Sequence, residues 1–102
     1  MQLIYYIYFY EVEKNGELGE LLDCEVCTTV NEVYERLKEL DDNNISLTLE
    51  YSKQEFNSKM KEGLARGDEH LLDSFYEDEN GTQIYLAVES ELVEDGYLGI
   101  SF

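Results

Sequence analysis

The chain is short of basic side chains. Its 102 residues include 24 Asp and Glu against seven Lys and Arg, which gives a formal net charge of −17. Nucleic acids and anionic membranes are themselves polyanions, so this balance argues against direct binding to either and favours a basic protein surface as the partner. Small domains stay soluble with a net charge of about 2–8 in magnitude, and a larger charge costs stability through self-repulsion. The excess therefore indicates a selected role.

Proline and tryptophan are absent, and the two cysteines form a CxxC pair, Cys24 and Cys27, just before an expected helix. That position suits a thioredoxin-like site, but the cis-proline that such folds place beside the thiols is missing. A zinc site lacks a second ligand pair, since His70 is the one histidine. The simpler interpretation is a strand with Leu22, Cys24 and Val26 pointing inward and Cys24 as a small buried hydrophobe.

No apolar run is long enough to cross a membrane. The longest, Leu3 to Tyr10, is far below the roughly 20 residues that a spanning helix needs. No basic segment precedes this run, so it is a poor signal peptide. We therefore expect a protein of the host cell cytoplasm, where a structural disulfide is not expected.

Catalytic and cofactor motifs are missing as well. The sequence has no Gly-rich phosphate loop, no GxSxG and no HExxH. The acidic loops 41–44 and 77–81 lack the alternating ligands and terminal Glu of an EF-hand. We therefore expect a protein that is not an enzyme and that needs no metal or other cofactor.

Hydrophobic periodicity and turn residues predict one α+β domain over residues 1–102. It should be a mostly antiparallel sheet with two helices, in the approximate order ββαβαβββ. The expected strands are 2–13, 18–26, 45–51, 70–77, 82–93 and 97–102, and the expected helices run from a Thr29–Glu32 capping box to Leu40 and from Ser52 to Gly63 or Gly67. Asn15-Gly16 predicts a hairpin with a type I′ turn, and Asn80-Gly81 predicts a second hairpin. Residues 70–77 would also suit a short helix.

The first expected strand carries a row of tyrosines, Tyr6, Tyr8 and Tyr10. Its other face is also largely apolar, so we expect a central strand with elements packed on both sides. In this interpretation the tyrosines belong to the core, with their hydroxyls at the rim. The alternative is that the row forms a homodimer interface or an anchor for the partner. The net charge argues against nucleic-acid stacking on these rings.

Carboxylates recur at regular spacing on the expected elements. Acids two apart in a strand, namely Glu11 with Glu13, Asp23 with Glu25 and Glu89 with Glu91, share one face, and acids three or four apart in a helix do the same. Such rows can imitate a phosphate backbone, and a DNA-binding protein would release its counterions to them in the same way. The candidate phosphate mimics are Glu11, Glu13, Glu17, Glu20, Asp23, Glu25, Glu32, Glu35, Asp73, Glu77, Asp78, Glu79, Glu89, Glu91, Glu94 and Asp95.

These features together predict a non-enzymatic acidic inhibitor. It would act as a DNA mimic that occupies the nucleic-acid-binding groove of a host defence nuclease, such as a restriction or CRISPR effector. The alternative is an immunity protein or antitoxin that neutralises a basic toxin nuclease, which a toxin gene directly upstream would favour. A third option is a housekeeping scaffold or subunit without mimicry.

Residues 7–23, IYFYEVEKNGELGELLD, and the helix expected after them resemble the first module of ArdA-type antirestriction proteins, over about residues 4–40. The matching residues are, in order, Ile7-Tyr8, Asn15-Gly16, Leu18, Gly19 and Asp23. The chain departs from the pattern at Lys14, where the family has Tyr, at Leu21, where it has Trp, and in the sequence CEVC. The resemblance implies a phage or mobile-element DNA mimic that blocks restriction enzymes. Small acidic phage-encoded anti-CRISPR proteins share the composition.

Overall fold

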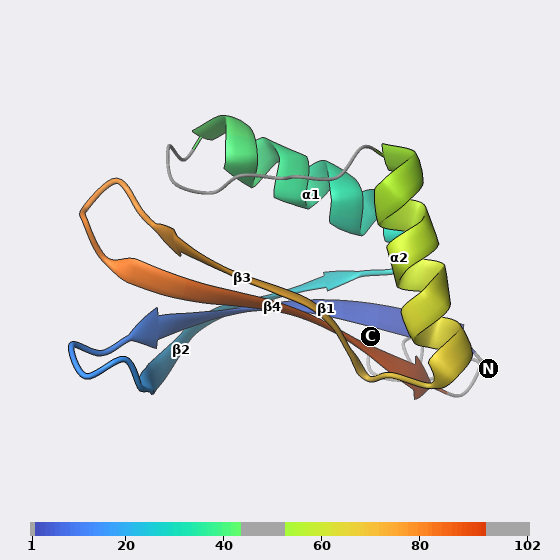
Figure 1. Ribbon diagram of the computed structural model, residues 1–102, viewed down its shortest axis with the longest axis horizontal. Coiled ribbons are helices and arrows are strands. Elements are labelled where there is room, and N and C mark those ends of the chain that lie inside the picture. Colours follow the sequence, from blue (N-terminus) through green and yellow to red (C-terminus); the bar gives the residue numbers. More distant parts are fainter. Residues whose placement is uncertain (1, 44–52, 94–102) are drawn as a thin grey trace, which may run out of the picture.

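Four antiparallel strands and two helices make up the computed structural model, which describes residues 2–43 and 53–93 (Figure 1). The elements are β1 (Gln2–Val12), β2 (Leu18–Cys27), α1 (Val30–Asn43), α2 (Lys53–Arg66), β3 (His70–Glu77) and β4 (Gln83–Val93). The strands lie in the order β2-β1-β4-β3. This confirms the predicted α+β class, the antiparallel sheet and the two helices. The strands expected at 45–51 and 97–102 lie outside the described residues.

Strand β1 lies in the middle of the sheet, as predicted, and its side chains alternate between the two faces. Tyr5, Ile7 and Phe9 point towards the helices and are buried. The antiparallel register sets Ile7 opposite Val88 and Phe9 opposite Leu86 on β4, so the two strands present one continuous apolar surface. Burial of that surface is the main driving force for packing the helices on it.

Both helices cover this face of the sheet (Figure 1). Val33 and Leu37 of α1 and Phe56 and Met60 of α2 join the same buried cluster as the β1 side chains. The rings of Tyr34 and Phe56 meet edge to face, with centroids 5.4 Å apart, and so connect the two helices.

The predicted helix termini are largely confirmed. The Glu32 N–H donates to Thr29 Oγ1 at 3.1 Å, which is the N-cap bond of α1. Helix α1 ends at Asn43, a few residues beyond the predicted end. At the end of α2, Gly67 has a φ of +79°. The Asp68 N–H donates to the Gly63 carbonyl at 2.9 Å, which forms a Schellman motif. The chain then enters β3, so the alternative of a short helix over 70–77 is wrong.

Both predicted hairpins are present, but the type I′ turn predicted at Asn15-Gly16 is wrong. Only the glycines have positive φ, +84° at Gly16 and +80° at Gly81. The Gly16 N–H donates to the Glu13 carbonyl at 2.8 Å, as a type I turn closed by a left-handed glycine requires. Asn15 contributes through its side chain instead, since its Oδ1 accepts the Glu17 N–H at 3.0 Å.

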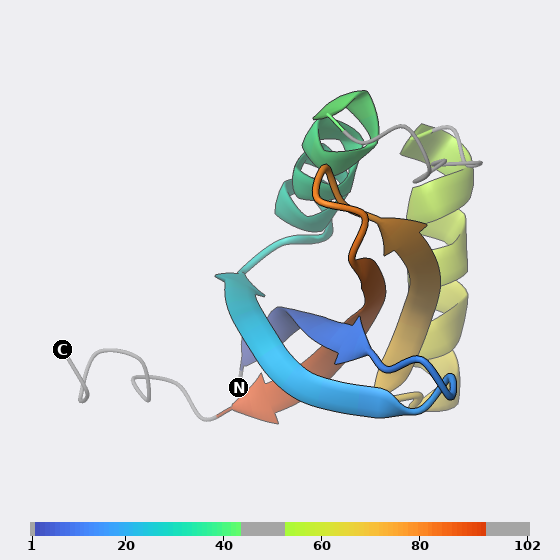
Figure 2. The same cartoon turned by 90° about the vertical axis from the view of Figure 1, so that its left-hand side faces the viewer.

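The opposite face of the sheet carries neither helix (Figures 1 and 2). Tyr6, Tyr8 and Tyr10 lie on it, half-buried and outside the core cluster. Ile4 lies on this face as well and is 0% exposed, so the predicted packing on both sides of β1 is confirmed there and, for the residues that the structure describes, is wrong for the stretch from Tyr6 to Tyr10. The reason is that α1 and α2 follow one another between β2 and β3 and bury their apolar stripes on the same face. Tyrosine is suited to the face without helices, because its ring packs against apolar neighbours and its hydroxyl is polar.

The two-layer arrangement predicts opposite outcomes for two phenylalanines. Phe56 is 0% exposed and Phe75 is 60% exposed. Phe56→Ala should lower the free energy of unfolding by about 3–5 kcal/mol, because it leaves a cavity between the layers. Phe75→Ala should lower it by about 1 kcal/mol or less. Urea unfolding followed by circular dichroism measures both. Equal losses for the two variants would contradict the layer assignment.

Candidate functional site

Five aromatic rings form a row across the uncovered face of the sheet, and we call the surface that they make the tyrosine face. It consists of Tyr6, Tyr8 and Tyr10 of β1, Tyr85 of β4 and Phe75 of β3. Successive ring centroids lie 5.9 Å (Tyr6–Tyr8), 6.2 Å (Tyr8–Tyr10), 6.4 Å (Tyr10–Tyr85) and 4.9 Å (Tyr85–Phe75) apart. These spacings lie in the range of attractive ring pairs. The row therefore runs without interruption over three strands.

Carboxylates stand on the same face and accept hydrogen bonds from the row. The Tyr6 hydroxyl donates to Glu91 Oε2 at 2.8 Å, and the Tyr85 hydroxyl donates to Asp73 Oδ2 at 2.8 Å. Glu89 lies directly opposite Tyr6 in the β1–β4 register. His70 lies between two of these acids, with Nε2 3.3 Å from Asp73 and Nδ1 3.9 Å from Glu89. The rings thus fix the positions of negative charges beside them.

The electrostatics of the tyrosine face disfavour any further negative charge on it. Burial, followed by the hydrogen bond to Asp73, raises the pKa of Tyr85 to about 12. Burial also raises the pKa of Tyr8, and the nearby Cys24, Glu89, Tyr10 and Glu91 add to that shift. A positive charge is favoured on the tyrosine face, because the same carboxylates and ring faces attract a cation.

One end of the tyrosine face opens into a groove of about 610 Å³, and we call it the acidic groove. It is lined by Leu3, Tyr6, Tyr8, Leu64, Gly67, Asp68, Glu69, Glu89, Ser90, Glu91 and Leu92. Four of these side chains are carboxylates, and Lys and Arg are missing from the lining. Arg66 nevertheless lies close by, because its Nη2 is 3.0 Å from Asp68 Oδ2.

The structure brings together only some of the predicted phosphate mimics. Asp73, Glu89 and Glu91 meet on the tyrosine face. Glu11, Glu13, Glu17, Glu20, Asp23, Glu77 and Glu79 are exposed elsewhere on the strands and hairpins, and Glu94 and Asp95 lie outside the described residues. The predicted pairing of Glu11 with Glu13 on one strand is wrong, because β1 ends at Val12 and Glu13 belongs to the turn.

Three of the predicted mimics make contacts within the chain that stabilise the fold. Glu25 takes a bidentate pair of hydrogen bonds from Arg36, at 2.7 and 2.8 Å, which ties β2 to α1. Asp78 Oδ1 accepts the Asn80 and Thr82 N–H groups and so shapes the second hairpin turn. Glu32 lies at the N-terminus of α1 and accepts a hydrogen bond from the Thr28 hydroxyl at 2.7 Å. The carboxylates of Glu25, Asp78 and Glu32 therefore have structural roles.

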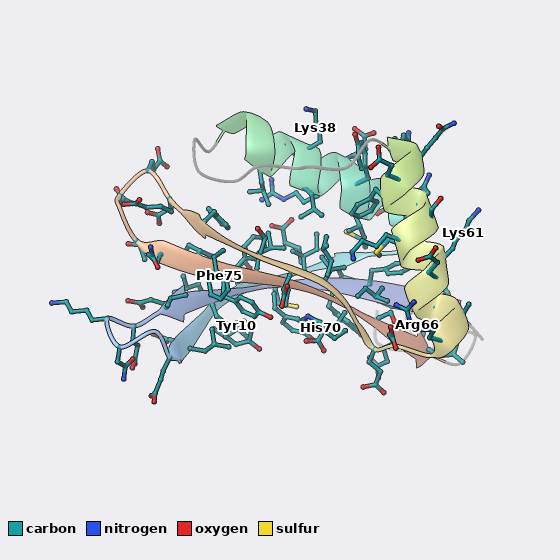
Figure 3. All side chains as sticks on the ribbon, in the orientation of Figure 1. Tyr10, Lys38, Lys61, Arg66, His70 and Phe75 are labelled. Atoms are coloured by element: carbon teal, nitrogen blue, oxygen red, sulfur yellow. The ribbon has the colours of Figure 1, made fainter. Side chains whose placement is uncertain are left out.

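Charge is separated between the two layers. The four strands carry eight acidic residues and no Lys or Arg, whereas the two helices carry seven acidic and six basic residues. Lys14, in the first hairpin, is the one base outside the helices. Figure 3 shows Lys38 and Lys61 projecting from the helices away from the sheet, while Tyr10 and His70 lie at the sheet. Of the two layers, the sheet therefore carries the excess of negative charge, while the helical layer is close to neutral.

The prediction that Cys24 points inward and is buried is wrong. Cys24 lies opposite Tyr8, on the tyrosine face, and is exposed, whereas Cys27 lies opposite Tyr5 and is 6% exposed. Residues three apart in a strand point to opposite faces, so the CxxC pair cannot act together without a change of backbone. Leu22 and Val26 are also exposed. Val26 lies opposite Tyr6, on the face that carries neither helix, and Leu22 lies at the bulge that follows the pairing of Phe9 with Asp23.

Sequence reasoning missed Phe75, Tyr85 and the groove carboxylates Asp68 and Glu69. The period-two pattern of residues 73–77 and 83–89 contained a signal for the first two, since Phe75 and Tyr85 alternate with inward residues of their strands. No pattern in the sequence indicated the acidic groove, because its shape depends on how the end of α2 meets β4.

Comparisons with protein-family models, with curated proteins and with solved structures find no match. The resemblance to ArdA-type proteins therefore stays a prediction. Within residues 2–43 and 53–93, no helix has the length and apolar character to span a membrane. The same residues contain no group of three or more His, Cys, Asp or Glu side chains that could hold a metal ion.

The two cysteines should differ in reactivity. Partial desolvation of the thiol, with added repulsion from Asp23 and Glu25, raises the pKa of Cys24, so its modification by a thiol reagent at pH 8 should be slow but complete. Cys27 should react only when the protein unfolds. Counting modified thiols by mass spectrometry, with peptide mapping, measures this. Equal reaction rates in the native protein, or a disulfide between the two, would contradict the assignment.

The Tyr85–Asp73 hydrogen bond can be tested by titration. A raised tyrosine pKa means that the folded state favours the neutral phenol, so this stabilisation is fully present below pH 10 and is lost towards pH 12. Asp73→Asn should lower the pKa of Tyr85, because it removes a negative charge beside the phenol. The Cζ chemical shifts of ¹³C-labelled tyrosine follow Tyr85 alone, with Tyr85→Phe as the assignment control. An unchanged pKa in the variant would refute the contact.

Proposed function

We propose that this protein is a non-enzymatic acidic inhibitor that binds the nucleic-acid-binding surface of a basic protein in place of nucleic acid. The observation that carries the proposal is the separation of charge, with eight acids and no Lys or Arg on the four strands. A negative charge that only served solubility would not need one layer to be free of bases. A surface that competes with a polyanion does need this, since each base on it would repel the basic partner.

The sheet also gives the carboxylates a fixed arrangement, as the backbone of a duplex fixes its phosphates. Neighbouring strands of a sheet lie about 4.8 Å apart, and the hydroxyls of Tyr6 and Tyr85 hold Glu91 and Asp73 in place. Fixed charges lose less conformational entropy on binding than mobile ones. The inhibitor works by stoichiometric occupation of the partner's groove, without turnover.

Electrostatic attraction sets both the rate and the salt dependence of this mechanism. A net charge of −17 steers a basic partner towards the protein and speeds their encounter. The bases of the partner's groove exchange their counterions for these carboxylates, as they do for phosphates. Binding should therefore weaken as salt increases, and it should compete with DNA or RNA for the same groove.

A capture experiment with nucleic acid as the eluent tests the proposal. The full chain is immobilised and exposed to a host-cell lysate at about 50 mM salt, and the retained proteins are identified by mass spectrometry. We expect nucleic-acid-binding proteins that duplex DNA or RNA elutes, and retention that falls steeply by about 200 mM salt. Each retained protein should bind that nucleic acid when purified, and the free chain should displace it.

The control eluent is a polyanion of another kind, polyglutamate, at the same charge concentration. Release by polyglutamate as efficient as release by nucleic acid would reduce the interaction to nonspecific charge attraction. Retained proteins that have no affinity for nucleic acid, or retention insensitive to salt, would contradict the proposal directly.

A further inference from the structure

We propose that the tyrosine face and the acidic groove form the docking surface of this inhibitor and that they bind arginine side chains of the basic partner. The inference rests on the proposed function and names the face that performs it. It selects one part of the acidic surface, because aromatic rings and carboxylates occur together there. The exposed acids of the two hairpins lie outside this row of rings.

The groove combines the two kinds of group that hold a guanidinium. Tyr6 and Tyr8 line it, with their ring centroids 5.9 Å apart, and Glu89 and Glu91 lie beside them on the neighbouring strand. Glu69 adds a third carboxylate. Asp68, the fourth, already pairs with Arg66, which shows that a guanidinium is accommodated at this rim. The volume of about 610 Å³ leaves room for more than one side chain.

Arginine suits this surface better than lysine does. A guanidinium is planar and weakly hydrated, so it stacks on a tyrosine ring and at the same time donates two parallel hydrogen bonds to a carboxylate. An ammonium is a compact, strongly hydrated charge and gains less from the ring. The row from Tyr10 to Phe75 extends the ring surface beyond the groove, so further arginines of the partner have a place to stack.

A second copy of this chain is a poor occupant of the tyrosine face. The four strands carry no Lys or Arg, so a face-to-face dimer would set Asp73, Glu89 and Glu91 of one copy against acids of the other. Like charges across an interface cost several kcal/mol in general. The homodimer that the tyrosine row suggested is therefore disfavoured at this face, and an arginine-rich partner is complementary to it.

Titration of the full-length ¹⁵N-labelled protein with nona-arginine and with nona-lysine tests the surface without a known partner. Both peptides carry about the same charge, so a difference between them reports on stacking and bidentate bonding. We expect nona-arginine to bind about three- to tenfold more tightly. Its chemical-shift changes should be concentrated at Tyr6, Tyr8, Glu89 and Glu91 rather than spread over all exposed acids.

A pair of charge-matched variants provides the control. Glu89→Gln with Glu91→Gln removes two charges from the tyrosine face, and Glu35→Gln with Glu62→Gln removes two from the helical layer. The first pair should weaken nona-arginine binding by about fivefold and the second by less than about twofold. Tyr8→Leu keeps an apolar side chain but removes the ring, so it should reduce the preference for arginine over lysine. Circular dichroism checks the fold of every variant.

Equal losses for the two charge pairs, or no preference for arginine, would overturn the inference. So would a dimer in sedimentation velocity that Tyr8→Glu dissociates, or shift changes absent from the groove because the rest of the chain fills it. A different result would contradict the proposed function. If captured partners lack affinity for nucleic acid while nona-arginine binds as expected, the docking surface is supported and the proposed function is contradicted. If DNA displaces the partner but the Glu89 and Glu91 variants bind the partner normally, another acidic surface binds it, and the docking surface is contradicted.

Discussion

Both helices bury their apolar side chains on one face of β1, and the rest of the architecture depends on this contact. Ile7 of β1, Val33 of α1 and Phe56 of α2 are each fully buried where the layers meet. Large apolar side chains in such a position contribute about 1.5–3 kcal/mol each through removal from water. Once both helices are committed to that side, the tyrosines of the same strand are left on the other side, between β2 and β4.

The charged residues are also distributed differently between the sheet and the helical layer. The helices have outward faces on which lysines and acids alternate, so that layer is close to neutral. The strands carry no Lys or Arg on either face, so their eight acids are not offset by bases within the sheet. Hydroxyl donors from Tyr6 and Tyr85 compensate part of the repulsion among its carboxylates. The bidentate Glu25–Arg36 pair links the acidic sheet to the mixed helical layer.

Much of the fold could be predicted from local patterns. The period-two runs placed the strands, the threonine cap placed the start of α1, and the Asn-Gly pairs placed both hairpins. The side of the sheet that each helix covers could not be predicted, because both faces of β1 are apolar and either would satisfy a helix. The error at Cys24 has the same origin, since the inward residue of β2 is set by its register with Tyr5. Asn15 shows another limit, because its side chain rather than a positive φ supports the turn.

The acidic candidate residues were predicted as a set, and the structure divides them by what each carboxylate contacts. Carboxylates that cap helices, shape turns or pair with Arg36 are occupied by the fold. Those beside aromatic rings are fixed and accessible together, and only the three-dimensional register reveals them. Spacing in the sequence could not separate these groups, because partners such as Glu91 and Tyr6 are 85 residues apart.

We propose the tyrosine face as the place where a basic partner binds, and side-chain footprinting of a captured complex tests that proposal most directly. Hydroxyl radicals oxidise accessible aromatic rings, and mass spectrometry locates the products. Phe75 and Tyr10 should lose reactivity when the partner is bound, while Tyr34 of the helical layer should keep its reactivity. Unchanged oxidation of Phe75 and Tyr10 in a complex that is otherwise intact would contradict it.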